Sequence, residues 1–574
     1  MTDLIPFALD PYAAISCPVK TQNEFNPLLH TGQPVDSYAV ECFREPTPHR
    51  SKVIRFLTDH HKESVRDLSV LDCDFRGEAT IAAMEEGVPI ILNAEMPIDW
   101  TNHRYGTADI LFRGDDVDGR PSYSPAMIKD HSILSPTPKG EGGQLVASLD
   151  HPFLNQARTS SYRYRIESQS SNLLLLAHMW YLVEAAGFGA LQPWGAIIGI
   201  DQLDKLHGCL VSWFSLSDKQ IRAYSYTASH QWRKYSPLSR YAHEHRFRVR
   251  VATHALQQTG SPNDPELVAS PVHIAECDSC EWWPQCQSSL QDDISVKIER
   301  SPLDAREIMT LRSLGVSTIT DLASIDVDSL LPEYLPRVAH RTGAETRLRL
   351  AAHRGRLLAE GVNLERLTTG PFVMPSAPVE IDMDIETSAS NHVYLWGFLV
   401  DDRRNGGGEP YYHAVSRFTS LNQAKELELA EEAATWLADL VKSLGDVPVL
   451  VWHYSNYEPA SLRRFARTRG GENSPALTWL TSYASDHFVD LFTIVRNNFF
   501  GVEGLGLKAI ATEGAGFTWR DADPSGLNSQ YWFSDAVHAS TPAQRLAAKT
   551  RILEYNEDDV RATWALRKWL RTLT

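Results

Sequence analysis

Three carboxylates alternate along one short segment of the chain, at Asp382, Asp384 and Glu386. The valine and isoleucine residues around them favour a β-strand, in which every second side chain points to the same face. Three acids on one face repel one another unless cations lie between them. A pair of divalent metal ions would fill that role. The alternative is a solvent-exposed acidic strand, which needs no ligand.

Two later segments supply further groups of the same kind. An apolar run that begins at Val449 predicts a buried strand, and it ends in a polar turn that carries Glu458. A helix predicted over 560–573 is opened by Tyr555 and Asp559, whose i, i+4 spacing places both on one helical face. The order is therefore an acidic strand, an acid after a second strand, and a tyrosine with an aspartate on a late helix.

This set of residues suits metal-assisted phosphodiester hydrolysis. We expect Asp384 to be shared between two metal ions about 4 Å apart, with Glu386 and Asp559 completing the ligand shells. One ion would lower the pKa of a bound water molecule, and the other would stabilise the leaving 3′ oxygen. Such a site handles phosphates and a terminal sugar rather than base edges, so it tolerates many nucleic-acid sequences.

The same order of motifs resembles the DEDD exonucleases of the RNase H-like (DnaQ-type) superfamily, whose first motif is Asp-x-Glu-Thr and whose third is Tyr-x-x-x-Asp-x-x-x-Thr. The matching residues are Asp384, Glu386, Thr387, Tyr555, Asp559 and Thr563. Glu458 stands where the family usually has an aspartate. The resemblance implies a 3′–5′ exonuclease that uses Mg²⁺ or Mn²⁺, with Tyr555 orienting the attacking water.

A second acidic site is predicted in the first half of the chain. Asp109 lies on one predicted strand and Lys129 follows on the next, an arrangement in which a carboxylate holds a metal while an ammonium polarises water. This resembles the RecB-type PD-(D/E)XK nucleases. Met127 stands where that family has its second acid, and Asp130 or Glu95 is the available substitute. The site is therefore either an active centre with a substituted ligand or a degenerate one that serves in nucleic-acid binding.

Three cysteines fall within ten residues, beside two tryptophans and a proline that would shield them. They are Cys277, Cys280 and Cys286. Clustered thiols predict a four-cysteine metal site, of either zinc or a 4Fe–4S cluster. The spacing is similar to that of iron–sulfur members of the RecB-type family, in which a distant N-terminal cysteine completes the set. Cys17 is the best match for that ligand, and Cys42 and Cys73 are the other candidates.

Three regions could contact a phosphate backbone. A turn at Gly315 between two short predicted helices has the look of a helix-hairpin-helix motif, whose backbone N–H groups can hold a phosphate. An arginine-rich run follows, which is otherwise a solvated helix face. Its candidate nucleic-acid-binding residues are Arg347, Arg349, Arg354 and Arg356. A second basic group, on a predicted strand, comprises Arg246, Arg248 and Arg250.

The chain has 574 residues, which is too long for one core. We predict an α/β multidomain protein with a PD-(D/E)XK-like nuclease domain and its four-cysteine metal staple (1–295), a helix-hairpin-helix-like connector (296–370) and an RNase H-like exonuclease domain (371–574). The net charge of −17 argues against long nonspecific tracking on duplex DNA. No signal peptide or membrane-length apolar run is found, so we expect a cytoplasmic protein without a membrane partner.

Taken whole, the chain resembles RecB-family nucleases that fuse an iron–sulfur PD-(D/E)XK-like domain to an RNase H-like exonuclease domain. The function this implies is a metal-dependent 3′–5′ exonuclease acting on single-stranded or frayed DNA ends in DNA repair or processing. An RNA-processing exonuclease is chemically almost the same, and a non-catalytic nucleic-acid-binding scaffold with two degenerate sites is the alternative of another class. No Walker A motif occurs, so any helicase would be a separate partner.

Overall fold

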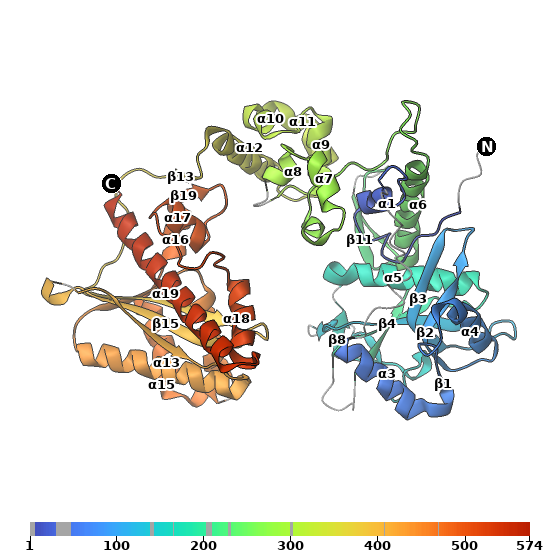
Figure 1. Cartoon of the computed structure of the whole chain (residues 1–574), viewed down its shortest axis with the longest axis horizontal. Coiled ribbons are helices and arrows are strands. Elements are labelled where there is room, and N and C mark those ends of the chain that lie inside the picture. Colours follow the sequence, from blue (N-terminus) through green and yellow to red (C-terminus); the bar gives the residue numbers. More distant parts are fainter. Residues whose placement is uncertain are drawn as a thin grey trace. The chain divides into compact units, whose positions relative to one another are not determined.

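The computed structural model describes residues 6–29, 47–137, 143–164, 166–201, 209–227, 231–298, 302–406, 408–468 and 470–573. The chain divides into two compact units, and the segment 297–344 contributes to both of them. One unit contains most of the chain up to Val296, and the other contains Glu345–Thr574 (Figure 1). In the described parts, no helix is long and apolar enough to cross a membrane.

The first unit is built on a mixed eight-stranded sheet. In spatial order its strands are β1 (Val65–Asp67), β2 (Ile90–Asp99), β3 (Arg104–Arg113), β4 (Tyr123–Ile128), β9 (Trp194–Ile198), β10 (Leu210–Ser215), β6 (Leu145–Ser148) and β7 (Arg158–Thr159). Strands β2, β3 and β4 are antiparallel neighbours, and β4 pairs with β9 in parallel. The predicted strand pair that carries Asp109 and leads to Lys129 is therefore present as β3 and β4.

Helices cover both faces of this sheet because its strands are apolar on both sides. Helix α3 (Pro48–His61) packs Val53 and Leu57 against Ile90 and Leu92. On the other face, α5 (Ile166–Ala185) and α4 (Cys73–Glu85) pack against alternate residues of the same strands. The further elements of this unit are α1 (Pro18–Glu24), α6 (Pro237–Leu256), α7 (Trp283–Ser289), α8 (Ile294–Lys297), α9 (Ala305–Ser313) and the strand pairs β5 (Leu134–Pro136) with β8 (Tyr162–Tyr164) and β11 (Ile221–Ser225) with β12 (Gln231–Tyr235).

The predicted strand of alternating arginines is wrong, because Arg246, Arg248 and Arg250 lie within helix α6. The Ser236 hydroxyl caps this helix by accepting a hydrogen bond from the Ser239 N–H, and a proline occupies its first position, where the missing N–H is not needed. Arg248 is buried and donates to the Ser16 carbonyl at 2.6 Å. It therefore anchors the N-terminal segment instead of offering a charge to nucleic acid.

The second unit is organised around a five-stranded sheet. Its spatial order is β16 (Tyr411–Ser416), β15 (Val393–Asp402), β14 (Val379–Thr387), β17 (Val449–His453) and β18 (Phe488–Asp490). The acidic strand β14 is central, antiparallel to β15 and parallel to β17. The strand prediction is confirmed, and the alternative of a solvent-exposed acidic edge strand is wrong.

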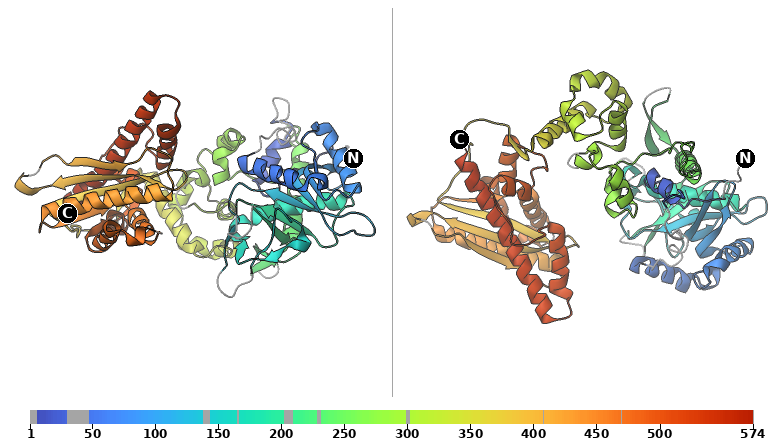
Figure 2. Two further views of the ribbon diagram at one scale, coloured as in Figure 1. Left: turned by 90° about the horizontal axis from the view of Figure 1, so that it is seen from below. Right: turned by 45° about the horizontal axis from the view of Figure 1, so that its top comes forward.

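The two faces of β14 have opposite character. Its odd-numbered residues, from Val379 to Ile385, pack with α13 (Gln423–Leu444) and α15 (Pro475–His487) in an apolar core. Its even-numbered acids face α19 (Pro542–Thr572), which crosses the other side of the sheet (Figures 1 and 2). A sheet covered on both sides excludes water from the acids, so each one needs a partner.

Helix α19 begins at Pro542, well before the predicted start near residue 555, so Tyr555 and Asp559 lie in its middle. Thr541 and Gln544 form a capping box there. The other elements of this unit are α10 (Ile319–Ser324), α12 (Ala344–Glu360), β13 (Leu364–Arg366), α14 (Tyr457–Arg467), α16 (Leu491–Asn498), β19 (Phe499–Gly501), α17 (Leu507–Glu513) and α18 (Gly526–His538). Helix α11 (Val327–Arg337) contributes residues to both units.

Candidate metal centre

Asp384, Glu386 and Asp559 bring one carboxylate oxygen each to within 4.8 Å of one another. Strand β14 supplies the first two from one face, and the middle of α19 supplies the third. Within the described ranges of the chain, this is the one group of three or more histidine, cysteine or acidic side chains that is so close. Two buried carboxylates and a partly exposed one, Asp384, at this separation are suited to a hard divalent cation with oxygen ligands.

Each of the three carboxylates accepts one hydrogen bond from a neutral side chain at 2.7 Å. Asn556 Nδ2 donates to Asp384 Oδ2, Ser529 Oγ to Glu386 Oε2, and Trp519 Nε1 to Asp559 Oδ1. Such donors fix the rotamer of a metal ligand and leave its second oxygen for the ion. The sequence analysis missed all three donors. Asn556 adjoins Tyr555 in the third motif, whereas nothing in the sequence marks Ser529 or Trp519.

A glycine makes room for one of these donors. Gly397 on β15 lies directly opposite Asp384 in the sheet register, and a Cβ atom there would lie 1.7 Å from Asn556 Oδ1. The Tyr412 hydroxyl donates to the same Oδ1 at 2.8 Å, so the amide nitrogen is turned towards Asp384. The local sheet therefore positions Asn556 by both a missing side chain and a hydrogen bond.

Glu458, predicted as the second-motif acid, lies near this group but outside its 4.8 Å limit. It is the second residue of α14 and its side chain is buried. Its Oε2 atom has no hydrogen-bond partner, and His453 Nδ1, which is charged only when the imidazole is protonated, lies 3.6 Å from it. A buried carboxylate oxygen without a donor is costly, so the residues present fit a metal ion that Glu458 would help to hold.

Burial and mutual repulsion raise the pKa of the site's carboxyl groups. Burial raises the pKa of Glu386 to about 8, with a further contribution from the Asp559 carboxylate. The pKa of Asp384 is raised well above its ordinary value by burial and by the carboxylates of Glu386, Asp559 and Glu458. Burial also raises the pKa of Asp559. Without a cation, Glu386 therefore retains its proton near neutral pH, and a divalent ion would displace it.

Metal binding should therefore release protons, and the affinity for Mn²⁺ should rise with pH up to about pH 8, by as much as about tenfold per pH unit for each proton displaced. Titration calorimetry in buffers of different ionisation enthalpy measures both quantities. An affinity that does not change between about pH 6 and pH 8, with no proton release, would contradict this expectation. Because the folded pKa of Glu386 is raised, its contribution to the stability of the metal-free protein should be present below about pH 4.5 and lost as the pH approaches 8.

Tyr555 lies at the same site and contacts a residue that the sequence analysis missed. Lys508, the second residue of α17, donates from Nζ to the Tyr555 hydroxyl at 2.7 Å. The Tyr555 hydroxyl is also hydrogen-bonded to Asp559. Burial and the three carboxylates raise the pKa of Tyr555, so its phenol keeps its proton. The ammonium of Lys508 acts in the opposite direction on the acids and lowers the pKa of Asp384, Glu386 and Asp559.

The prediction that cations of a metal site neutralise all three alternating acids is wrong for Asp382. Asp382 and Glu380 lie further along the same face of β14, and both are fully buried against Arg567 of α19. The Arg567 guanidinium donates to both oxygens of Asp382, at 3.1 and 2.7 Å. The acidic strand thus serves two purposes. Glu380 and Asp382 bind Arg567, whereas Asp384 and Glu386 belong to the candidate metal centre.

Of the aromatic residues near the second motif, one is exposed. Trp452 and His453 are buried in the sheet, so neither can stack on a base. Tyr457 is 45% exposed, and its hydroxyl is hydrogen-bonded to the Thr387 hydroxyl next to Glu386. Tyr457 therefore lies at the rim of the metal centre with part of its ring open to solvent.

In the first unit, Asp109 is bound by protein groups. Arg50 of α3 pairs with Asp109 Oδ1, and the Ile128 N–H donates to Oδ2 at 2.7 Å. Lys129 follows the end of β4, and the Thr47 hydroxyl donates to Asp130. Asp109 belongs to no group of three potential ligands among the described residues. Asp109 was predicted to bind a metal ion, but the Arg50 guanidinium lies where that cation would bind.

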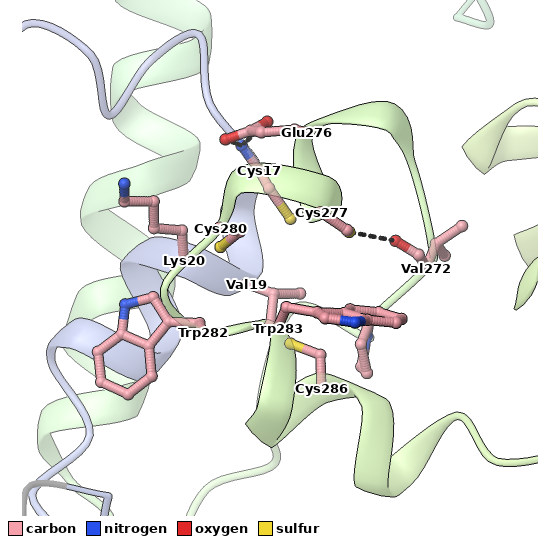
Figure 3. A pocket seen from close by; sticks show the side chains of 11 residues that line it. Cys17, Val19, Lys20, Val272, Glu276, Cys277, Cys280, Trp282, Trp283 and Cys286 are labelled. Atoms are coloured by element: carbon pink, nitrogen blue, oxygen red, sulfur yellow. Dashed lines mark hydrogen bonds between the residues drawn. The ribbon is translucent and has the colours of Figure 1, made fainter. Parts of the chain in front are cut away.

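The four predicted cysteine ligands, Cys17, Cys277, Cys280 and Cys286, line one small cavity in the first unit (Figure 3). Cys17 precedes α1, and the other three lie between residue 275 and the end of α7. Trp282 and Trp283 also line the cavity. Among the described residues, no three thiols come within 4.8 Å of one another. The alternatives to Cys17, which are Cys42 and the Cys73 side chain, lie outside the described parts.

The predicted phosphate-binding residues have varied surroundings. Arg354 is buried and lies 5.2 Å from the centre of the Phe500 ring, so its prediction as a nucleic-acid contact is wrong. Arg349 pairs with Asp328 and Glu345, and Arg347 donates to the Pro302 carbonyl. Arg356 is exposed.

The predicted phosphate site after Gly315 is already used by the protein. Gly315 has a φ of +84°, which suits the predicted turn. The Asp321 carboxylate accepts from the N–H groups of Ser317 and Thr318 at the start of α10. A phosphate bound there would have to displace that carboxylate.

The comparison with protein families finds one match, to a model described as RNase H superfamily, at residues 382–571. The comparison with curated proteins gives no match. The matched segment begins in the acidic strand and ends in α19, so it contains the whole carboxylate group. The predicted RNase H-like C-terminal domain is confirmed, and such a domain implies a metal-dependent nuclease with a nucleic-acid substrate.

Proposed function

We propose that this chain is a metal-dependent 3′–5′ exonuclease that shortens single-stranded or frayed DNA ends in DNA repair or processing. The observation that carries the proposal is the group of Asp384, Glu386 and Asp559 inside the segment matched as RNase H superfamily. Each of these carboxylates accepts a hydrogen bond at 2.7 Å from a neutral side chain, and such donors orient the ligands of a metal site.

Asp384, Glu386 and Asp559, with Glu458 beside them, would hold Mg²⁺ or Mn²⁺, and the bound ions would activate water and stabilise the leaving 3′ oxygen. Asn556, Ser529 and Trp519 keep the ligands oriented before substrate arrives. Tyr555 retains its proton, and its hydroxyl would orient the attacking water. The low exposure of the acids strengthens every electrostatic contact in the site.

The preference for single-stranded ends rests on Tyr457. Its half-exposed ring lies next to the metal centre, and stacking on an aromatic side chain favours an unpaired base of any identity. The bases of RNA could stack on Tyr457 in the same way, so the experiment below compares DNA with RNA.

A panel of 5′-labelled oligonucleotides tests this function with the full chain and Mn²⁺. Single-stranded DNA should give a ladder that shortens from the 3′ end, blunt duplex DNA should be cut more slowly, and a 3′-terminal phosphorothioate linkage should stop the reaction. The same panel in RNA decides whether the enzyme processes RNA instead. Internal cuts from the first minute, or cutting of a strand with a blocked 3′ end, would refute the exonuclease assignment.

For the first unit we propose a PD-(D/E)XK-like domain whose nuclease site is degenerate and which serves in nucleic-acid binding. The support is the pairing of Asp109 with Arg50 and with the Ile128 N–H, together with Met127 in the place of the second acid. The Arg50 guanidinium already neutralises the Asp109 carboxylate, so a metal ion would have to displace it.

For the four cysteines we propose a 4Fe–4S cluster that joins the N-terminal segment to the end of the domain, with Zn²⁺ as the competing occupant. A tetrahedral zinc site with Zn–S bonds of about 2.3 Å needs thiols about 3.8 Å apart. No three of the cysteine sulfurs in the described residues lie within 4.8 Å of one another, so they are not gathered as tightly as that zinc tetrahedron requires. The two tryptophans at the cavity would shield it from solvent.

Cys280→Ser should therefore remove most of the iron and acid-labile sulfide from anaerobically purified protein and lower its thermal stability. Cys209→Ala is a matched control, since Cys209 is buried in the core of the same unit, away from the cavity. Metal analysis of the wild type distinguishes the occupants: about four iron atoms per chain support the cluster, and one zinc atom without sulfide contradicts it.

A further inference from the structure

The reaction chemistry above leaves the role of Lys508 at the metal centre unassigned. Its Nζ atom lies 2.7 Å from the Tyr555 hydroxyl and 5.8 Å from the centre of the Trp519 ring. Both neighbours are bonded to the same carboxylate, since Trp519 donates to Asp559 and the Tyr555 hydroxyl is hydrogen-bonded to it. Lys508 is therefore attached to the site through Tyr555.

The hydrogen-bond chemistry of the two groups fixes a direction. An ammonium has three donors and no acceptor, so the Tyr555 oxygen must accept from Lys508. The phenol proton is then directed away from Lys508, towards Asp559 and the metal centre. Without Lys508, the hydroxyl could rotate and accept a hydrogen bond from another donor, and its proton would lose this fixed direction.

Charge favours the same arrangement. Lys508 lies close enough to lower the pKa of all three carboxyl groups of the centre, yet it donates its hydrogen bond to the neutral phenol. A bound divalent cation would repel an ammonium that ligated the acids directly. An ammonium bonded to the phenol keeps its place when the carboxylates bind metal.

We propose that Lys508 is a positioning residue for the reaction: it holds the Tyr555 hydroxyl so that its proton is directed towards Asp559 and the metal centre. This inference rests on the proposed nuclease function. It assigns to Lys508 an effect that is transmitted through one hydroxyl group, and it therefore predicts that the effect disappears when that hydroxyl is removed.

A double-mutant cycle tests this prediction. Lys508→Met, Tyr555→Phe and the double variant are compared with the wild type for cleavage of a 5′-labelled DNA strand at saturating Mn²⁺. Lys508→Met should lower kcat by about 10- to 100-fold with little change in KM. In the Tyr555→Phe background the same change should lower kcat less than about twofold. Lys508→Arg, which keeps a donor, should recover part of the activity, and Lys549→Met on α19 is the control for lost charge.

Multiplicative losses in the double variant would overturn the inference, because they would mean that Lys508 acts independently of Tyr555. An unchanged kcat in Lys508→Met would overturn it as well. If the wild type cuts no nucleic acid, the proposed function fails, and the hydrogen bond is then tested by the thermal unfolding of the four metal-free proteins. A combined loss of Tm smaller than the sum of the single losses supports the Lys508–Tyr555 link, and an additive loss refutes it.

Discussion

Replacing Asp384 by asparagine should lower the rate of metal-dependent cleavage by about 1,000-fold or more, because it removes the carboxylate expected to bind both ions. Asparagine keeps the shape of the side chain, and Asp384 belongs to a group of buried acids that repel one another. The variant should therefore be at least as stable as the wild type without metal. The measurement is kcat on single-stranded DNA at saturating Mn²⁺, together with Tm in EDTA.

Asp402→Asn is the matched control for this experiment. Asp402 ends the neighbouring strand β15 and pairs with Arg404 at the surface. Its replacement should leave kcat within about twofold of the wild type, since exposed ion pairs contribute little. Full activity of Asp384→Asn would mean that the C-terminal acids are not the reacting centre.

Replacing Arg567 by methionine should destabilise the second unit by about 3–5 kcal/mol, because it leaves the two carboxylates of Glu380 and Asp382 buried without their shared cation. Arg571 and Arg403 would still pair with Glu380, at 2.7 and 2.9 Å. Most of the lost stability would therefore come from Asp382, whose pairing with Arg567 would be removed. Chemical unfolding at neutral pH measures this loss.

The pH dependence of the loss identifies its cause. Burial and Asp401 raise the pKa of Asp382, so the carboxyl group left behind in the variant should take up a proton as the pH falls. The deficit should therefore shrink towards pH 5 and grow with rising pH. Lys568→Met, an exposed neighbour on α19, is the control and should change stability by less than about 0.5 kcal/mol. An equal loss at all pH values would point to packing instead of charge.

The acidic strand could be predicted from the sequence because alternation is a local property. The residues between Val379 and Thr387 specify a strand, its two faces and the acids that share one face. Which cation each acid meets is not local: Arg567 lies 185 residues from Asp382 in the sequence. Nothing around Asp382 distinguishes it from Asp384, so the division of the strand between an arginine and a metal centre needed the fold.

The residues that contact the acidic ligands could not be predicted from the sequence for a similar reason. Lys508 lies on α17, Ser529 lies on α18, and Trp519 lies in the loop between these helices. Each of the three contacts the metal centre through residues that are distant in the sequence. Gly397 becomes meaningful only when β15 is paired with β14 and Asn556 lies over it.

The segment around Arg248 was wrongly predicted as a strand, although its sequence contains a helical pattern. Tyr241, His245, Arg248 and Ala252 are all buried in α6, and their spacing of three or four residues is that of one helical face. Ser236 followed by Pro237 is also a common helix start. The alternating arginines were a weaker pattern than this longer one.

The most direct test of the account compares the wild type, Asp384→Ala and Asp109→Ala on one gel, with anaerobically purified full-length protein, 5′-labelled single-stranded DNA and Mn²⁺. We expect the strand to shorten with the wild type and with Asp109→Ala, and to remain intact with Asp384→Ala. Activity that survives Asp384→Ala and is lost with Asp109→Ala would place the reaction in the first unit. Binding of the strand without cutting by any of the three proteins would make the chain a nucleic-acid-binding scaffold and contradict the proposal that the C-terminal acids catalyse hydrolysis.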